Sequence, residues 1–404
     1  MKKLASVGLG ILTSVGGYLE VGSMGTALQA GAAFRYSLLW ALALGTICIA
    51  FLCEMTGRLA AVSHHTVVAA VRERFGLSFQ VWPLGAQVIV DLFVLASELG
   101  GAALALQLVT GVPLALSVVP VLLLVWCCLW FATFGAIEHS VALLGLVTLC
   151  FVAAAWRLGP EWAAVRAGLL PRVPSTARAH YAYLAVSILG ATISPYLVTF
   201  YSSGAIEEKW DQSQVAPNRI VAAAGMGFGS LISMAIVVAA ALVLAPRNIV
   251  PESFPQALPV LMVPFGRWGF WLFSASLFIG CIGAALEIAL DLSYIVAQTF
   301  GWNWGEDEKP DEAPRFALLY TGALLLAIVP SLFGIDPLKL TMFSMALTVV
   351  ALPLVVGPLL VVMNDRSYLK RQTNGLISNV ATILIVALAF ALAVIAIPVQ
   401  VMGS

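Results

Sequence analysis

Six acidic side chains lie inside stretches of the sequence that are otherwise apolar. They are Glu20, Glu54, Asp91, Glu98, Glu287 and Asp291. No lysine lies well inside these stretches, and Arg58 sits near the end of one of them. An ionised side chain in an apolar medium is costly unless it is paired or hydrated, so each of the six is a candidate functional group. Because all six are acidic, the set is suited to cations or protons rather than to anions.

Two of the spacings place charged residues on one face of a helix. Glu54 and Arg58 are four residues apart, and we expect them to form a structural ion pair. Asp91 and Glu98 are seven residues apart and also share a helix face. This second pair predicts an acidic stripe that could carry protons.

Glu287 and Asp291 repeat the spacing of four with two like charges, which repel each other. We therefore expect at least one of them to be protonated, exposed to water or paired with another helix. The spacing leaves two alternatives open for these acids, a proton relay and the lining of a water-filled vestibule.

The elements that must position these acids are membrane spans. Of the 404 residues, 61% are hydrophobic and 10% are charged, and the mean hydropathy is +1.00, whereas soluble domains have about 45 to 50% apolar and about 25% charged residues. Apolar stretches of at least about 20 residues occur eleven times, at about residues 5–31, 36–58, 83–109, 113–133, 138–158, 181–206, 219–245, 268–300, 314–333, 338–363 and 376–401. The sequence predicts an all-α membrane protein with eleven transmembrane helices in a single domain, residues 1–404.

The charged residues and the start of the sequence indicate which partners the protein has and how it is oriented in the membrane. The 20 Lys and Arg balance the 20 Asp and Glu, so nothing in the net charge indicates a nucleic-acid partner. The apolar run after Lys2 and Lys3 continues without a convincing cleavage site, which favours a retained first span over a signal peptide. With the N-terminus cytoplasmic, twelve Lys and Arg fall on the inner side and eight on the outer side. The positive-inside rule favours this orientation, with the C-terminus outside.

Motifs of soluble catalysis are missing from the sequence. It contains no HExxH, GxSxG or Walker loop, and His64 and His65 lie in the loop after the second span. The six cysteines all fall in apolar runs without a CxxC pair, which indicates buried structural thiols. A transporter is therefore favoured over a membrane enzyme.

Two of the eleven spans are interrupted. In the first, SVGGYLEVGSMG, Gly17 and Gly22 surround Glu20; in the sixth, ATISPYLVTF, Pro195 follows Ser194. Pro195 cannot donate the backbone hydrogen bond that a continuous helix needs. Interruptions five spans apart indicate an inverted-repeat transporter, in which unwound backbone holds the substrate at the midplane. The alternative is that the glycines only permit close packing and the proline only kinks its helix.

The interrupted segments resemble those of a known family. Residues 17–40, GYLEVGSMGTALQAGAAFRYSLLW, are similar to the first-helix motif of the NRAMP family of proton-coupled divalent metal transporters, whose central tetrapeptide is Asp-Pro-Gly-Asn. Residues 191–203, ATISPYLVTFYSS, are similar to the sixth-helix segment that contains Met-Pro-His-Asn. The resemblance continues through ASELGGAALALQL and ALPLVVGPLLVVMNDR and covers nearly the whole chain.

The two motifs depart from the family pattern at most positions. Only the glycine and the proline are kept, as Gly22 and Pro195, and these mark the helix breaks. Glu20 stands at the position of the family's Asp, and Ser194 stands at the position of its Met, so the family's thioether is missing there. The resemblance implies these metal-binding residues: Gly17 and Ala191 through their carbonyls, together with Glu20, Ser23, Ser194 and Tyr196.

Further residues are matched outside the two motifs. Glu98 matches an acid of the family's proton route, whose second acid is replaced by Leu95. Met345 falls near a tenth-span ligand as an additional residue that lines the site, and Arg315 is matched to the proton-exit arginine. The expected proton pathway or vestibule then consists of Glu98, Asp91, Arg315, Glu287 and Asp291.

The resemblance implies a LeuT-type inverted-repeat fold, with repeats at about residues 5–158 and 181–363 and a peripheral span at about 376–401. It implies a secondary transporter in the cell (inner) membrane that imports a divalent cation by alternating access, with protons as a second partner, no cofactor and no obligate protein partner. Because oxygen ligands suit Mg²⁺ and Mn²⁺, these ions are favoured, and the chain is similar to the NRAMP-related magnesium transporter branch. The alternatives are a symporter of small, amino-acid-like solutes on the same fold and a relative that does not transport.

Overall fold

The computed structural model describes residues 20–131, 143–305 and 308–402, and every regular element within these ranges is a helix. Nine helical segments in this part of the chain are long and apolar enough to cross a membrane. They are α3 (Leu39–Ser63), α5 (Leu77–Thr110), α6 (Leu114–Phe131), α10 with α11 (Arg178–Thr192 and Pro195–Glu207), α12 (Val215–Val243), α14 (Arg267–Phe300), α15 with α16 (Pro314–Ala327 and Val329–Leu332), α17 (Pro337–Met363) and α19 (Leu376–Met402). The prediction of an all-α, multi-pass membrane protein is confirmed.

The two remaining predicted spans also have helical counterparts. The first corresponds to α2 (Val21–Phe34), and the fifth to η1 with α8 (Leu146–Thr148 and Leu149–Leu158); both predicted spans begin outside the described residues. Four short α-helices lie in the connections, namely α4 (Val67–Phe75), α9 (Trp162–Ala167), α13 (Pro259–Phe265) and α18 (Arg366–Leu369). Of these, α9 lies in the connection between α8 and α10.

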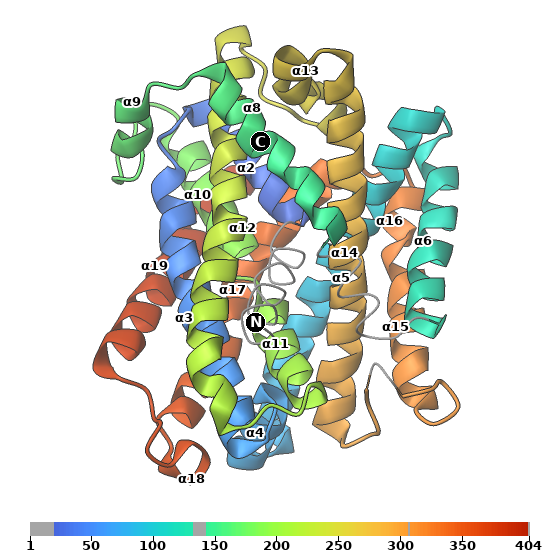
Figure 1. Ribbon diagram of the computed structural model, residues 1–404, viewed down its shortest axis with the longest axis vertical. Helices are drawn as coiled ribbons and strands as arrows, with labels where there is room; N and C mark the ends of the chain where they lie inside the picture. Colours follow the sequence, from blue (N-terminus) through green and yellow to red (C-terminus); the bar gives the residue numbers. More distant parts are fainter. Residues whose placement is uncertain (1–19, 132–142, 306–307, 403–404) are drawn as a thin grey trace.

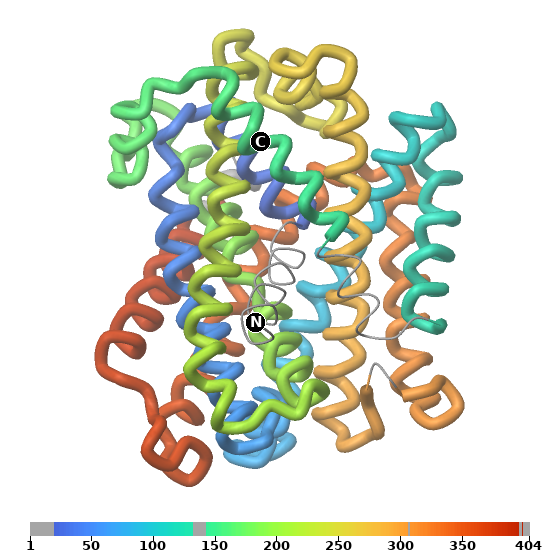
Figure 2. The backbone as a smooth tube through the Cα atoms, in the orientation of Figure 1, coloured from blue at the N-terminus to red at the C-terminus, as the bar shows by residue number. Residues whose placement is uncertain are grey.

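The two longest helices form the centre of the bundle. α5 and α14 have 34 residues each and pack against each other, and α5 also packs along α17. In Figures 1 and 2, α6 and α15 lie at one edge of the molecule and α19 lies at the opposite edge. Burial follows this arrangement. Of the apolar stretch of α5, 78% is buried inside the protein, compared with 22% for α6 and 28% for α19. The apolar side chains of the edge helices are thus left to the lipid.

The start of α17 is defined by local chemistry. The Asp336 side chain accepts a hydrogen bond from the Leu338 amide at 2.8 Å, and Pro337 occupies the first helical position, where its missing N–H costs nothing. Burial raises the pKa of Asp336 above its ordinary value, whereas the amides of Leu338 and Lys339 act in the opposite direction. This cap sets the register in which α17 presents its side chains to the interior.

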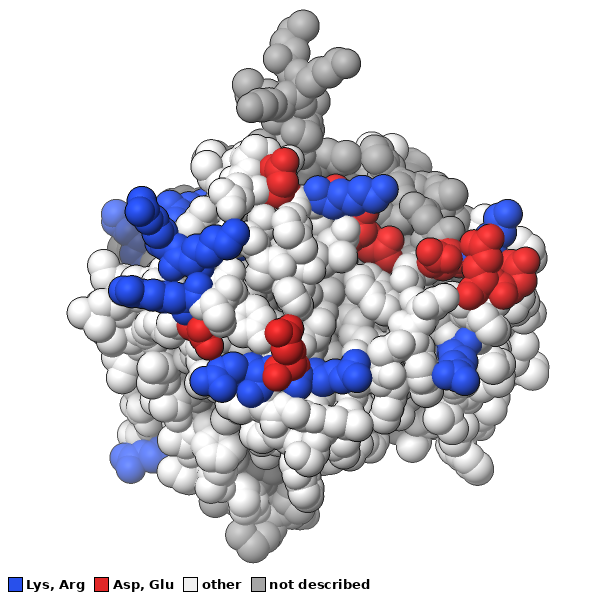
Figure 3. Space-filling view, turned by 90° about the horizontal axis from the view of Figure 1, so that it is seen from below, with Lys and Arg blue, Asp and Glu red and all other residues white. Residues whose placement is uncertain are grey.

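One end of the bundle carries α4, α18 and the 207–214 connection (Figure 1). Figure 3 shows this end, where Lys and Arg form several groups with Asp and Glu between and beside them. Arg74 of α4 pairs with Asp365, the cap of α18, at 3.2 Å. The predicted ion pair also lies at this end: Arg58 Nε donates to Glu54 Oε1 at 3.0 Å. Arg58 in addition bonds to Asn374 Oδ1 at 2.6 Å, so the pair ties α3 to the connection before α19.

Candidate cation site at two helix breaks

The first break lies immediately before α2. Glu20 is extended, with φ −93° and ψ 169°, and α2 begins at the next residue. Its backbone carbonyl accepts hydrogen bonds from the Met24 amide at 3.1 Å and from the Ser23 hydroxyl at 3.0 Å. Its side chain is 2% exposed. The sequence thus places a carboxylate inside the protein at the point where the helix starts. Gly17, which the sequence analysis also assigned to the site, lies outside the described residues.

The second break separates α10 from α11. α10 ends at Thr192, Ser194 is extended with φ −71° and ψ 126°, and Pro195 is the first residue of α11. In a continuous helix the carbonyl of Ala191 would accept from the amide of residue 195, which proline lacks. The proline therefore releases the Ala191 carbonyl and gives the following helix a preset first residue. The predicted interruption at Pro195 is present, and at the first one the described residues show an extended Glu20 followed by the start of α2.

The two breaks face each other. The Ser194 hydroxyl donates to Glu20 Oε1 at 3.4 Å, and the Tyr196 hydroxyl is also a hydrogen-bond partner of the Glu20 carboxyl group. The second oxygen, Glu20 Oε2, is buried and has no hydrogen-bond partner within the described part of the chain. A buried polar atom of this kind is costly unless a ligand or water satisfies it. Residues 174 positions apart therefore form one polar cluster with an unused acceptor.

Glu98 of α5 contacts the first break through its carboxylate. Its two carboxylate oxygens accept from the Val21 amide at 3.0 and 3.1 Å, at the N-terminus of α2. A helix N-terminus has unpaired amides and a partial positive charge, and both stabilise a carboxylate at this position. Glu98, which the sequence analysis assigned to a proton pathway or vestibule, lies next to Glu20, and its bonds give it a structural role that the sequence did not indicate. It fixes where α2 starts and so positions Glu20.

Met345 of α17 lies against both breaks. It is fully buried, and its sulfur would be 2.6 Å from a Cβ placed on Gly22, with Glu20 Oε1 at 3.0 Å from the same point. The Met345 carbonyl would overlap a Cβ placed on Gly190, in the last turn of α10. Both glycines are required by this close approach rather than by an unusual backbone angle. A thioether from α17 therefore lies beside Gly22 and the Glu20 carboxylate.

The other intramembrane acids form a second group on α5 and α14. Asp291 Oδ2 accepts from Gln87 Nε2 at 2.8 Å and from the Thr199 hydroxyl at 2.9 Å, and the side chain of Asp91 is adjacent. The expectation that one member of the Glu287–Asp291 pair contacts another helix is met by Asp291, which bonds to α5 and α11. Glu287 lies one turn earlier on α14. It is 9% exposed and is close enough to Tyr196 to act on it electrostatically.

Sequence analysis assigned one residue to the acids that the structure places elsewhere, and it missed two residues that contact them. Arg315 is exposed at the start of α15, with its guanidinium 5.0 Å from the centre of the Trp302 ring, so the structure does not bring it to the buried acids. Gln87 and Thr199 were not singled out, although they hold Asp291. The signal for Gln87 was available, since it is four residues before Asp91 on the same helix face.

The ligand set at the breaks is sparse and mixed. Among the residues that the structure describes, no three His, Cys, Asp or Glu side chains come close enough to bind one metal ion together. What converges is one carboxylate, two hydroxyl groups and a thioether, and the second break also releases the Ala191 carbonyl. Such a set lacks the closed cage of a structural metal site and suits an ion that arrives with part of its water and leaves again.

Comparison with known proteins places this geometry in a family context. The family model for natural resistance-associated macrophage protein-like (Nramp) proteins matches residues 10–398. The divalent metal cation transporter MntH of Deinococcus radiodurans is 26% identical over 405 residues, covering 95% of this chain and 88% of that protein. MntH 1 of Pseudomonas aeruginosa is 33% identical, but the match covers only 50% of this chain and 47% of that protein.

Solved structures agree on the fold. The manganese transporter of Eremococcus coleocola has a TM-score of 0.83 at 22% identity, covering 99% of this chain and 87% of that one. Mhp1, a nucleobase-cation-symport-1 family transporter, has a TM-score of 0.63 at 15% identity, covering 96% and 92%. At these identities the likeness concerns the fold alone, and it confirms the predicted LeuT-type architecture with its first and sixth helices broken.

Proposed function

The chain belongs to the Nramp family, and from this premise we propose that it is a secondary transporter that carries a divalent metal cation, Mn²⁺ before Mg²⁺, between the two helix breaks. The observation that carries the proposal is the buried Glu20 carboxylate, whose Oε2 has no hydrogen-bond partner in the described part of the chain. A divalent cation at this oxygen would satisfy it and compensate its charge. The names of the relatives from Deinococcus radiodurans and Eremococcus coleocola support a divalent metal as the substrate.

The order of preference between metals rests on the mixed ligand set. Carboxylate, hydroxyl and carbonyl oxygens suit Mg²⁺ and Mn²⁺, whereas a thioether is a soft ligand that Mg²⁺ does not use. Because the Met345 sulfur lies beside the same point as Glu20 Oε1, the site favours a cation that tolerates sulfur. We therefore place Mn²⁺ before Mg²⁺ as the substrate, whereas the sequence analysis favoured both ions.

The direction of transport and the proton partner complete the proposal. In the N-inside orientation the end with α4 and α18 faces the cytoplasm, and alternating access delivers the ion there. Glu98 is the proton-responsive group for coupling, because protonation would weaken its two bonds to the Val21 amide and so loosen the start of α2 beside Glu20. An amino-acid-like substrate is disfavoured, since its carboxylate would be repelled by Glu20.

Calorimetry on the purified chain tests the metal and the sulfur together. We expect binding of MnCl₂ and CdCl₂ to the wild type, weaker binding of MgCl₂ and no heat from amino acids. Met345→Leu conserves the side-chain volume but removes the sulfur, so the affinity for Cd²⁺ should fall about tenfold, about 1.4 kcal/mol, with a smaller change for Mn²⁺. The matched control is Met363→Leu, which is equally buried on α17 but about 27 Å farther along the helix. Unchanged Cd²⁺ affinity in Met345→Leu would show that the sulfur does not face the ion.

A further inference from the structure

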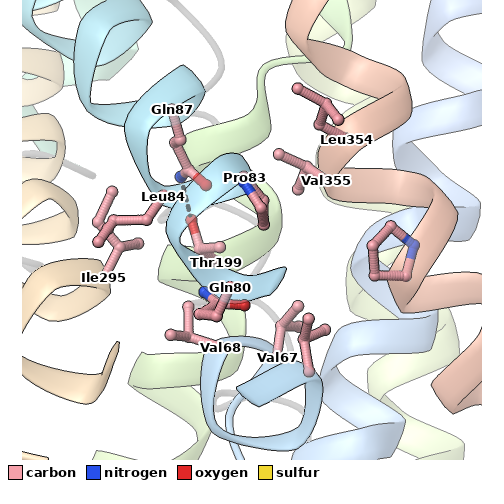
Figure 4. Close-up of a pocket in the computed structure, with 12 residues that line it drawn as sticks. Val67, Val68, Gln80, Pro83, Leu84, Gln87, Thr199, Ile295, Leu354 and Val355 are labelled. Atoms are coloured by element: carbon pink, nitrogen blue, oxygen red, sulfur yellow. Dashed lines mark hydrogen bonds between the residues drawn. The ribbon is translucent and has the colours of Figure 1, made fainter. Parts of the chain in front are cut away.

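The described part of the chain contains cavities of very different size. One of them lies between α4, α5, α11, α14 and α17 and is drawn in Figure 4, where Gln87 bonds to Thr199. Its volume is about 20 Å³, which is room for about one water molecule. Another cavity has a volume of about 560 Å³, within the roughly 300–1,000 Å³ of sites that bind small organic molecules. This larger cavity has room for a ligand other than water.

The larger cavity is a groove along α3, which packs against both α12 and α19. In Figure 1 the first residues of α19 stand away from α3. Six residues of α3 line the groove, from Thr46 to Arg58, and the others come from the beginning of α12 and of α19. We call it the α3 groove. Its twelve residues of helix rise about 18 Å, and one leaflet contributes about 15 Å of hydrocarbon, so the α3 groove covers the depth of one leaflet.

The lining of the α3 groove changes from apolar to charged along the helix. Ile47, Ala50 and Phe51 line the part nearer the middle of α3, and the Ile47 side chain is 51% exposed. Glu54 and Arg58 line the part nearer the end of the bundle that carries α4. A lipid in a bilayer has the same order, with its polar headgroup outside the hydrocarbon core and its acyl chains inside it. The α3 groove therefore matches an amphiphile in both length and polarity.

The charged end of the α3 groove has one positive charge in excess. Glu54 pairs with Arg58 at 3.0 Å and with Arg219 of α12 at 3.4 Å, so two cations share one carboxylate. The buried Arg58 guanidinium also donates to the Asn374 side chain and to the Gln372 carbonyl. Arg219, in contrast, has a side chain that is 65% exposed, and only its Nε has a partner among the described residues. Its two Nη groups remain for a ligand.

The ligand that fits this end is a phosphate group. A guanidinium is a planar fork of donors that binds phosphate through two parallel hydrogen bonds. Gly375 lines the same groove and stands immediately before Leu376, where α19 begins. The partial positive charge of that helix N-terminus adds to the charge of Arg219. An anionic headgroup gains from both, whereas a headgroup without net charge gains less.

We propose that the α3 groove binds one anionic phospholipid, with its phosphate at Arg219 and one acyl chain along Ile47, Ala50 and Phe51. The lipid comes from the leaflet at the α4 end, which is the cytoplasmic leaflet in the N-inside orientation. The proposal is independent of which ion the protein carries, because it rests on residues outside the two helix breaks. A lipid in this place contacts α3, α12 and α19 together, and by linkage it stabilises their packing.

Native mass spectrometry of the full-length protein in detergent tests the headgroup. In a titration with phosphatidylglycerol, the wild type should bind one lipid more tightly than all others, and phosphatidylcholine with the same acyl chains should bind about tenfold more weakly. Arg219→Gln should lower the affinity for phosphatidylglycerol about tenfold, because the charge-assisted bonds to the phosphate are lost. The matched control is Arg366→Gln, which removes an exposed arginine of α18 that does not line the α3 groove. Equal affinities of wild type and Arg219→Gln would overturn the proposal.

A second variant tests the apolar part of the α3 groove without changing any charge. Ala50→Leu places a larger side chain where the acyl chain lies, so the affinity for phosphatidylglycerol should fall at least about threefold, while size-exclusion chromatography still shows one folded species. Inorganic phosphate at the same concentration should not displace the lipid, because it has no acyl chain. Unchanged affinity in Ala50→Leu, or displacement by inorganic phosphate, would show that Arg219 binds a free anion at the surface instead of a lipid in the groove.

Discussion

Glu20→Gln is expected to reduce metal uptake in proteoliposomes to the rate of empty vesicles. Glutamine keeps the shape of the side chain and an acceptor for the Ser194 and Tyr196 hydroxyls, but it removes the negative charge that is bonded to the second break. Within the described residues, no three His, Cys, Asp or Glu side chains come together that could hold a metal ion in its place. The loss should therefore be close to complete, whereas Glu20→Asp, which withdraws the carboxylate by one methylene, should only weaken uptake.

The matched control for this experiment is Glu252→Gln. Glu252 is an exposed glutamate whose side chain lies 3.7 Å from Lys339 at the surface, and surface pairs of this kind contribute little. Its uptake should equal that of wild type, and size-exclusion profiles of both variants should show one folded species. Uptake by Glu20→Gln at the wild-type rate would remove Glu20 from the site.

Gly190→Ala is expected to cause the largest loss of stability among conservative changes near the site. A Cβ at this position would overlap the backbone carbonyl oxygen of Met345, and a backbone atom cannot move aside as a flexible side chain can. α10 and α17 would have to separate, which costs about 1–3 kcal/mol or more for overpacking. The measurement is the thermal unfolding midpoint of the purified protein, followed by its tryptophan fluorescence.

Gly227→Ala provides the comparison for that measurement. Gly227 lies inside α12, and no atom lies within 4 Å of the place where its Cβ would be. Alanine is favoured over glycine in a helix interior by roughly 0.5–1 kcal/mol, so this variant should unfold at the wild-type temperature or slightly above it. Equal unfolding midpoints for the two variants would contradict the tight packing of α10 on α17.

The sequence predicted those features that depend on one segment at a time. Composition and apolar length were sufficient for the spans, and the chemistry of proline was sufficient for the break at Pro195. Glu20 was found because it is a lone charge beside glycines, and the Glu54–Arg58 pair was found because both residues lie on one helix. In each case the physical cause is local, so the pattern can be read without knowledge of the neighbouring helices.

The features that the sequence did not predict depend on packing between helices. The bonds from Glu98 to the Val21 amide join residues 77 positions apart, and nothing in the α5 sequence indicates which amide lies opposite. The sulfur of Met345 reaches the site because α17 starts at its Asp336 cap and packs against Gly190. The bond from Gln87 to Asp291 needs α5 and α14 in one register, whereas sequence spacing paired each acid with a neighbour on its own helix.

The location of a bound ion tests the central claim most directly. Crystals of the full chain grown with MnCl₂ should give an anomalous difference peak for manganese between the two breaks, in contact with the Glu20 carboxylate and next to the Ala191 carbonyl, Ser194 and the Met345 sulfur. The same crystals of Glu20→Gln should lack that peak. A manganese peak that lies elsewhere in the bundle, or that persists unchanged in Glu20→Gln, would contradict the assignment of the cation site to the helix breaks.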